Sequence, residues 1–221
     1  MKKQILILSG PTHEYIDPVR FIGNASSGKM GKCLAEEAAR RGYKVEMISG
    51  PVAEENLPQT KGIFVHRVIS AEEMLLKAEA LFSSSDYIFF AAAVADYAPA
   101  EKLAQKKAKS AEEFLLRLRP TPDIAQQLCA HKKAKQIAIG FALQTENGEE
   151  HARKKLKKKH LNGIVLNTPA TLGAHEGTFS YLSALHTTFN PWGRISKEAC
   201  AQRILDAAEQ LETLAKKTSP S

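Results

Sequence analysis

The stretch QILIL at residues 4–8, followed by the turn residues Gly10 and Pro11, decides the fold. A short apolar run bounded by turn residues is typical of a strand that is buried on both faces of a parallel sheet. Three more apolar runs follow at residues 45–48, 63–68 and 87–90, and helical patterns lie between them at 28–41 and 71–82. This alternation predicts a mostly parallel sheet that is covered by helices.

The second half of the chain continues the pattern less regularly. We expect strands at residues 114–119, 136–139 and 164–166, an antiparallel edge strand at 179–189, and helices at 122–130, 148–160 and 195–215. Together the elements predict an α/β, Rossmann-like fold, in which a mostly parallel sheet has helices on both faces and an antiparallel segment at its edge. Because no internal repeat or Pro/Gly-rich linker divides the chain, we expect a single domain over residues 1–221.

The composition excludes several classes of protein. Hydrophobic residues make up 43% and charged residues 25% of the chain, which fits neither a disordered protein nor a coiled coil. No apolar run approaches the roughly 20 residues that cross a bilayer, and the run at 5–8 is too short for a signal-peptide core. Cys33, Cys129 and Cys200 lie too far apart for a disulfide framework or a zinc site, so we expect a reduced, cytoplasmic protein with no membrane partner.

The net charge of +7 comes from the middle of the chain. Residues 101–160 contain 15 Lys and Arg against 7 Asp and Glu, a local net charge of +8 that is concentrated at 102–109 and 153–159. A local basic patch indicates an anionic partner, and both a nucleic acid and a nucleoside triphosphate meet that requirement. For any single lysine, a solvated helix face is the alternative interpretation.

The loops that follow the predicted strands are where a ligand should bind, because open parallel sheets bind ligands beyond the carboxyl ends of their strands. The first loop ends in NASSGKMG at residues 24–31, where Ser26 or Ser27 is expected to cap the helix. Small residues that lead into a helix N-terminus form an anion site. Residues 23–30 also match GxxxxGK of a Walker A loop, but Met30 replaces the Ser or Thr that binds magnesium, and no GxGxxG occurs.

The loop after the fourth predicted strand carries a run of alanines and then Asp96, with Lys106 ten residues further on. Alanines allow a flat ligand to approach the backbone closely, and a lone carboxylate can accept hydrogen bonds from it or hold a metal-bound water. A tightly packed junction in which Asp96 is a cap is the alternative. Residue patterns alone therefore predict an α/β domain that binds a phosphorylated small molecule.

Six motifs, taken in order, resemble those of the phosphopantothenate–cysteine ligase family. They are GPTHEYIDPVR (10–20), NASSGKMG (24–31), AAVADY (92–97), PDI (122–124), GFALQTE (140–146) and ARKKLKKK (152–159). The resemblance spans about residues 4–210, nearly the whole chain. Because the first two motifs are long and specific, chance is a poor explanation for it.

This resemblance implies that the chain joins 4′-phosphopantothenate to L-cysteine in coenzyme A biosynthesis. CTP would be cleaved to CMP and pyrophosphate through an acyl-cytidylate, with Mg2+ accompanying the nucleotide. The larger eukaryotic members favour ATP, whereas the length and motifs of this chain resemble the bacterial, CTP-dependent members. In most bacteria the domain follows a flavin-dependent decarboxylase, and none precedes Met1, so we expect a stand-alone synthetase without FMN. The family is typically homodimeric, which implies a second copy as partner.

The resemblance also implies which residues form the site. Asn24 and Lys106 would be catalytic. The asparagine would convert the acyl intermediate, with its amide as a hydrogen-bond donor to the acyl oxygen, and the lysine would assist the first step. The nucleotide would be bound by Phe90, Ala91, Ala92, Asp96, Lys106, Pro122, Asp123, Ile124, Ala125, Phe141, Lys155 and Lys159. The phosphopantothenoyl part would be bound by Arg20, Asn24, Gly28, Lys29 and Met30, and the metal by Asp96. The i, i+4 spacing of Lys155 and Lys159 allows both to face one site from a single helix.

The chain departs from the family's motifs at three places. KKAK at 106–109 replaces the usual Lys-x-Lys-Lys, Ala98 replaces a common arginine, and Thr121 replaces an asparagine before PDI. Another lysine of the same segment, Lys102 or Lys107, therefore remains an alternative for the catalytic role.

Two other functions compete with the ligase. A nucleic-acid-binding module would use the basic middle of the chain, but few aromatic residues cluster there and no recognised DNA- or RNA-binding motif occurs. A nicotinamide or flavin oxidoreductase would use a similar sheet, but the glycine fingerprint is missing. We therefore expect small-molecule substrates and no nucleic-acid partner.

Overall fold

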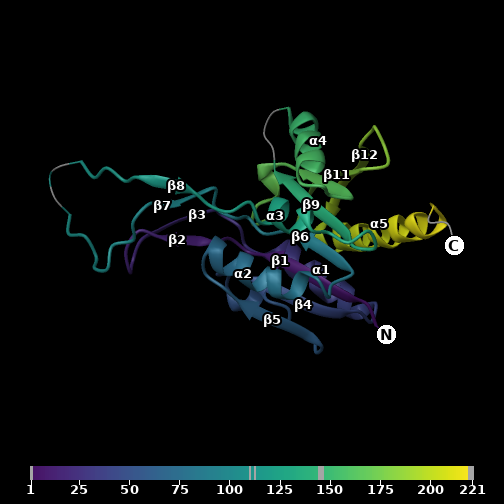
Figure 1. Cartoon of the computed structure of the whole chain (residues 1–221), viewed down its shortest axis with the longest axis horizontal. Coiled ribbons are helices and arrows are strands. Elements are labelled where there is room, and N and C mark those ends of the chain that lie inside the picture. Colours follow the sequence, from purple (N-terminus) through teal and green to yellow (C-terminus); the bar gives the residue numbers. More distant parts are fainter. Residues whose placement is uncertain (1, 110, 112, 144–146, 219–221) are drawn as a thin grey trace.

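The computed structural model describes residues 2–109, 111, 113–143 and 147–218. The strands of its main sheet are β1 (Gln4–Ser9), β4 (Lys44–Ser49), β5 (Ile63–Arg67), β6 (Tyr87–Phe90), β9 (Ile137–Leu143), β10 (Gly163–Asn167), β11 (Glu176–Ser183) and β12 (Asn190–Ser196). Within the described residues they form one eight-stranded sheet in the order β12-β11-β10-β9-β6-β1-β4-β5 (Figure 1). The strands from β10 to β5 run parallel, and β11 and β12 join antiparallel at one edge.

The helices cover both faces of this sheet. They are α1 (Lys29–Arg40), α2 (Ala71–Phe82), α3 (Ile124–Ala130), α4 (Gly148–Lys158) and α5 (Lys197–Thr218). On β1, Ile5 and Ile7 belong to the core beneath α1 and α5, whereas Leu6 and Leu8 belong to the core beneath α2 and α3. Because successive side chains of a strand point to opposite faces, both faces of β1 are buried, as its continuous apolar sequence predicted. The predicted α/β, Rossmann-like architecture is therefore confirmed.

The antiparallel edge differs in detail from the prediction. Instead of one strand over 179–189, a hairpin of β11 and β12 forms the edge, and the closing helix starts at Lys197 because residues 195–196 pair within β12. β12 was missed because all of its residues are exposed or half-buried, so they show no hydrophobic pattern. In the described part of the chain, no helix is both long and apolar enough to cross a membrane.

Two small antiparallel sheets project from the main sheet (Figure 1). One pairs β2 (His13–Tyr15) with β3 (Phe21–Gly23), and the other pairs β7 (Tyr97–Pro99) with β8 (Leu118–Pro120). We call residues 13–23 and 97–120 the arm. The predicted strand at 114–119 is wrong before Leu118, and β2, β3 and β7 were missed, because strands of three residues carry too little periodicity to be recognised.

Candidate active site

A cavity of about 510 Å3 lies at the carboxyl ends of β1, β6, β9 and β10. The chain leaves β1 through α1 to β4 on one side, and it returns through α2 to β6 on the other side of β1. Because the two crossovers cover opposite faces, they diverge above β1 and leave a crevice there, where open α/β sheets bind ligands. This is the edge of the sheet at which the sequence predicted a ligand.

The residues that the family resemblance implied for the site converge on this cavity, with two exceptions. Its lining includes Asn24, Gly28, Lys29, Met30, Phe90, Ala91, Ala92, Asp96, Pro122, Asp123, Ile124, Ala125, Phe141, Lys155 and Lys159. Arg20 and Lys106 do not line it and lie in the arm. Residues far apart in the sequence are thus brought to one place by the strand order.

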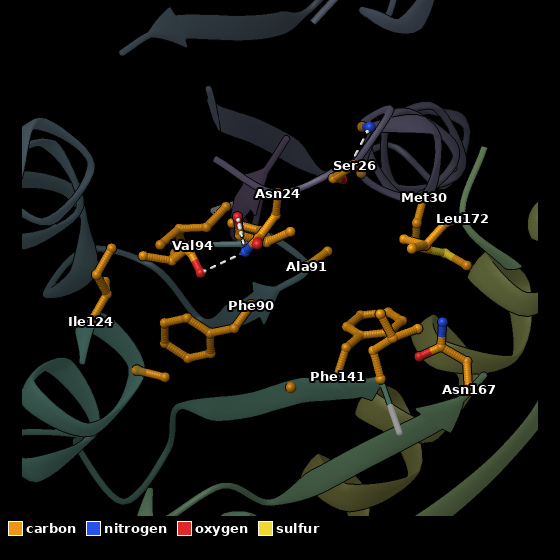
Figure 2. Close-up of a pocket in the computed structure, with 18 of the residues that line it drawn as sticks. Asn24, Ser26, Met30, Phe90, Ala91, Val94, Ile124, Phe141, Asn167 and Leu172 are labelled. Carbon is orange, nitrogen blue, oxygen red and sulfur yellow. Dashed lines mark hydrogen bonds between the residues drawn. The ribbon is translucent and has the colours of Figure 1, made fainter. Parts of the chain in front are cut away.

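The cavity has two lobes, which Figure 2 shows on either side of Asn24 and Val94. On the first side lie Phe90 and Ile124 (Figure 2). We call this side the α3/α4 lobe and include in it the lining residues Lys155, from α4, and Lys159, which is paired with Asp123 at the start of α3. On the second side lie Met30, Phe141, Asn167 and Leu172 (Figure 2). We call this side the α1/α5 lobe and include in it the lining residue Lys197, with which α5 begins. The first lobe therefore combines apolar walls with two lysines from one helix, and the second contains an aromatic ring beside an amide.

Helix α1 begins without a side-chain cap, contrary to the prediction for Ser26 or Ser27. The N-cap is Gly28, whose φ of 75° places it in the left-handed region, and no side chain accepts a hydrogen bond from the first turn. A glycine suits this position because the conformation is costly for other residues and because an added Cβ would lie 2.8 Å from Cγ1 of Val52. The uncapped N–H groups and the helix dipole favour an anion at this end of α1.

Asn24 links the loop that follows β1 to the loop that follows β6. Its Nδ2 donates hydrogen bonds to the carbonyl oxygens of Ala93 at 3.2 Å and Val94 at 2.9 Å (Figure 2). Both amide hydrogens are therefore used by the protein, and within the described residues Oδ1 accepts no hydrogen bond. The family resemblance led us to expect an amide donor toward the substrate, whereas this geometry presents an acceptor.

Two ammonium groups and two carboxylates meet in the α3/α4 lobe. Lys155 Nζ donates to the carbonyl oxygen of Phe141 at 2.6 Å, and Lys159 Nζ forms an ion pair with Asp123 at 2.8 Å. Asp123 also caps α3, because its Oδ1 accepts from the N–H of Gln126 at 3.2 Å. Burial and the neighbouring Lys159 lower the pKa of Lys155 to about 8, partly opposed by Asp123 and Asp96.

Asp96 is exposed at the mouth of the cavity rather than serving as a helix cap. Among the described residues, no group of three or more His, Cys, Asp or Glu side chains could hold a metal ion on its own. Mg2+ is commonly bound through one or two carboxylates together with the phosphates of a nucleotide. Asp96 and Asp123, which both influence the charge of Lys155, fit that donor set and do not fit an all-protein cage.

Arg20 and Lys106 are held away from the cavity. The guanidinium of Arg20 donates to buried Asp17 at 2.9 Å from Nε, and also to the carbonyl oxygen of Lys107 at 3.0 Å. These bonds keep the pKa of Asp17 well below its usual range. Lys106 is exposed on the arm segment between β7 and β8. Neither side chain therefore lines the cavity of its own chain.

Several lining residues were not found by sequence reasoning, notably Asn167, Leu172 and Lys197. Asn167 had a usable signal, since it is the polar residue that ends the strand predicted at 164–166. No sequence signal pointed to Lys197, because the sequence predicted it as one residue of a helix that begins at residue 195. In the structure its side chain is only 6% exposed.

Comparison with known proteins places this fold and cavity in a family. Residues 1–211 match the family described as "DNA/pantothenate metabolism flavoprotein C-terminal domain". The chain belongs to this family. A relative from Vibrio parahaemolyticus serotype O3:K6, named coenzyme A biosynthesis bifunctional protein CoaBC, is 41% identical over 216 residues, which cover 95% of this chain and 53% of the relative.

A second relative and a solved structure extend the comparison. A protein named cysteine/cysteine sulfinic acid decarboxylase, from an unknown prokaryotic organism, is 43% identical over 175 residues, which cover 79% of this chain and 48% of that protein. The chain thus spans about half the length of the curated relatives it matches. The crystal structure of the C-terminal domain of CoaBC has a TM-score of 0.79 and 35% identity, and the match covers 97% of this chain and 96% of that one.

Membership of the flavoprotein C-terminal domain family accounts for the order of the six sequence motifs. Five of them lie wholly within the described residues, and residues 144–146 of GFALQTE lie outside them. The described part of that motif supplies Phe141 to the cavity.

Proposed function

We propose that the chain is a phosphopantothenate–cysteine ligase that activates its acid substrate with CTP. The observation that supports this most strongly is the meeting, in one cavity, of the uncapped α1 N-terminus, the half-buried Lys155 and Asn24. Its membership of the family and its match to relatives named as coenzyme A biosynthesis proteins indicate the same pathway. The proposal assigns this activity to the part of those relatives that the chain matches.

In the first step, a carboxylate oxygen of 4′-phosphopantothenate attacks the α-phosphorus of CTP. A P–O bond forms to the acid, and the bond to pyrophosphate breaks, which leaves an acyl-cytidylate. Negative charge accumulates on the phosphates in this step, so preorganised cations lower its barrier. Lys155 of α4 and Lys159, the residue at which this helix ends, both line the cavity and would supply that charge.

In the second step, the amine of L-cysteine attacks the acyl carbon. A C–N bond forms, the C–O bond to CMP breaks, and the amine gives up a proton. We infer that Asn24 orients this amine, because its Oδ1 is the acceptor that the amide presents while Nδ2 is bonded to the loop carbonyls at Ala93 and Val94. An acceptor at this place favours an N–H nucleophile over the sulfur of the same substrate.

Mg2+ would be held by Asp96 and Asp123 together with the phosphates, and when bound it would neutralise part of the triphosphate charge. Asp123 also limits the position of Lys159. Asp123 keeps Lys159 beside α3 by their ion pair, so Lys159 is preorganised at the phosphate side of the cavity.

We further propose that the protein acts as a homodimer in which the arm of one copy reaches the cavity of the other. Arg20 and Lys106 lie on the arm and away from their own cavity, although the family resemblance implied both for the site. The arm also exposes apolar side chains, including Phe21, Tyr97 and Leu118, which a second copy would cover. The basic segment around Lys106 would then meet the phosphates in the partner's cavity.

The remaining parts of the proposal concern location and cofactors. We propose a cytoplasmic enzyme whose ligase reaction needs no FMN and which binds no nucleic acid. The name of the decarboxylase relative gives no separate support for a decarboxylase here, because less than half of that relative is matched.

An omission assay tests the proposed function. Purified protein is incubated with 4′-phosphopantothenate, L-cysteine, Mg2+ and each of the four nucleoside triphosphates in turn, and pyrophosphate and the amide product are measured. We expect the amide product only when all components are present, with CTP as the best nucleotide. Lack of product with every nucleotide would overturn the proposal.

A further inference from the structure

Asn167 is a polar residue of the cavity to which neither the sequence motifs nor the proposed mechanism assigns a role. It ends β10, where it is paired with Leu143 of β9 and Phe179 of β11. Its side chain enters the α1/α5 lobe beside the ring of Phe141, and Met30 and Leu172 form the opposite wall (Figure 2). A single amide therefore stands at the edge of a slot that is walled by the apolar side chains of Met30, Phe141 and Leu172, with Lys29 and Lys197 also in its lining.

The orientation of this amide is fixed by a hydrogen-bond relay. Nδ2 of Asn167 donates to Oγ1 of Thr171 at 2.5 Å, and Oγ1 of Thr171 donates its one hydrogen to the carbonyl oxygen of Thr168 at 2.7 Å. Because the Thr171 hydroxyl has no second hydrogen, it can only accept from Asn167, so the amide cannot be turned around. Oδ1 of Asn167 therefore faces the cavity, on the side of Phe141 (Figure 2).

We propose that Asn167 reads the exocyclic amine of the nucleobase and thereby selects CTP over UTP. The inference rests on the proposed function, since it concerns the nucleotide of that reaction. A flat base stacked on Phe141 must offer an N–H to Oδ1, and the 4-amino group of cytosine does so. The O4 atom of uracil would instead bring two acceptors together, although the two rings have the same size and shape. Adenine also carries an amino group, so Asn167 alone does not separate CTP from ATP.

The distribution of charge supports this placement of the base. Lys155 contacts the backbone carbonyl oxygen of Phe141, and Lys159 is paired with Asp123 at the start of α3, where the two ammonium groups favour phosphates. The ring of Phe141 lies on the other side, beside Asn167 (Figure 2). In the α1/α5 lobe, Lys29 Nζ is already bonded to the carbonyl oxygen of Gly173 at 2.8 Å. Lys197 is buried there, and burial lowers its pKa. Its ammonium can meet the O2 atom that cytosine and uracil share, so it adds affinity for both without choosing between them.

The test compares CTP and UTP binding by titration calorimetry and, in parallel, amide formation with each nucleotide. We expect the wild type to prefer CTP by on the order of tenfold or more, because mispairing a buried polar group is costly. Asn167→Leu should bring the ratio of the two affinities close to one. Asn167→Asp, which keeps an acceptor toward the cavity, should preserve the preference even if both affinities fall.

Thr171→Val is the second route to the same answer, because it frees the amide to rotate without touching its acceptor. In this variant the affinity for UTP should rise relative to the affinity for CTP. Lys197→Met should lower the affinities for CTP and UTP to the same extent. Asn190→Leu, on the exposed edge strand, should leave both affinities unchanged. Unfolding midpoints of all variants report whether each one is folded.

The outcomes separate the inference from the proposed function. If the wild type makes the amide with CTP but Asn167→Leu and Thr171→Val keep its CTP-to-UTP ratio, the role of Asn167 is overturned and the ligase stands. If the wild type makes no amide with any nucleotide, the proposed function itself fails.

Discussion

Lys155 is the residue through which pH should act on the cavity. Its ammonium is bonded to the Phe141 carbonyl oxygen, and burial together with Lys159 lowers its pKa to about 8 from an ordinary value near 10.5. Phosphates bind the protonated ammonium, so nucleotide binding must raise this pKa. The contribution of Lys155 to affinity is therefore complete below about pH 8 and is lost as the pH rises above it.

We predict that CTP affinity falls on the order of tenfold between pH 7 and pH 9.5 in the wild type, as a charge-assisted hydrogen bond is lost. The Lys155→Met variant should already bind CTP weakly at pH 7, and its CTP affinity should not show this fall between pH 7 and pH 9.5. Calorimetric titration across the range checks both statements. Lys154→Met, an exposed neighbour on the same helix, is the matched control and should follow the wild type. A steep fall that persists in Lys155→Met would contradict the assignment.

Asn24 should affect the second step more than the first. Asn24→Ala removes the acceptor for the incoming amine but leaves the lysines of the α3/α4 lobe in place, so the acyl-cytidylate should still form. In a rapid-quench experiment, we expect pyrophosphate to appear in a burst of about one equivalent per site while amide formation falls on the order of a hundredfold or more. Equal loss of both steps would show that Asn24 acts earlier than proposed.

At the scale of elements, the left-handed start of α1 determines how closely a ligand can approach its first turn. Gly28→Ala would strain a φ of 75° and would place a Cβ 2.8 Å from Cγ1 of Val52. Gly42→Ala has a similar φ of 83° but open space around the added atom. The comparison of the two variants therefore separates steric contact from backbone strain.

We predict that Gly42→Ala lowers the free energy of unfolding by about 1–2 kcal/mol without changing CTP affinity. Gly28→Ala should lower the free energy of unfolding by about 1–3 kcal/mol more than Gly42→Ala does, and it should also lower the affinity for CTP. Urea denaturation and calorimetry measure the two effects. Equal destabilisation of both variants, with unchanged CTP binding in each, would argue against a ligand at the α1 N-terminus.

How far the sequence predicted each element depended on burial. The helix at 71–82 and the strand at 87–90 have the predicted limits, because their apolar faces are buried and Ser70 caps α2 through its bond to the Glu73 N–H. β12 has no buried residue and the strands of the arm are only three residues long, so no periodicity revealed them. In the site, strand order predicted which loops would meet, but the acceptor that Asn24 presents depends on carbonyls of another loop, which local sequence does not encode.

At the scale of the whole molecule, the arm separates Arg20 and Lys106 from the cavity that their motifs should serve. A C2 dimer resolves this, because the surfaces that meet are the same on both copies and each arm can serve the other's cavity. The two catalytic lysines would then come from different chains. Complementation between two inactive variants tests this directly.

We predict that Lys106→Ala and Lys155→Ala are each inactive alone and recover activity when they are co-expressed. Random pairing makes half of the dimers mixed, and each mixed dimer contains one site with both lysines, so about a quarter of wild-type activity should return. If both lysines act within one chain, every site in a mixed dimer lacks one of them and no activity returns. Sedimentation of each variant serves as the control for dimer formation.

The activation of a carboxylate on the α-phosphorus of CTP can be followed with an isotope. In 4′-phosphopantothenate labelled with 18O in its carboxylate, one labelled oxygen becomes the bridge of the acyl-cytidylate and leaves with CMP when the amine attacks. Mass spectrometry of the products should therefore find one 18O in CMP and none in pyrophosphate. Label in inorganic phosphate or pyrophosphate, or unlabelled CMP beside a complete yield of amide, would contradict the mechanism.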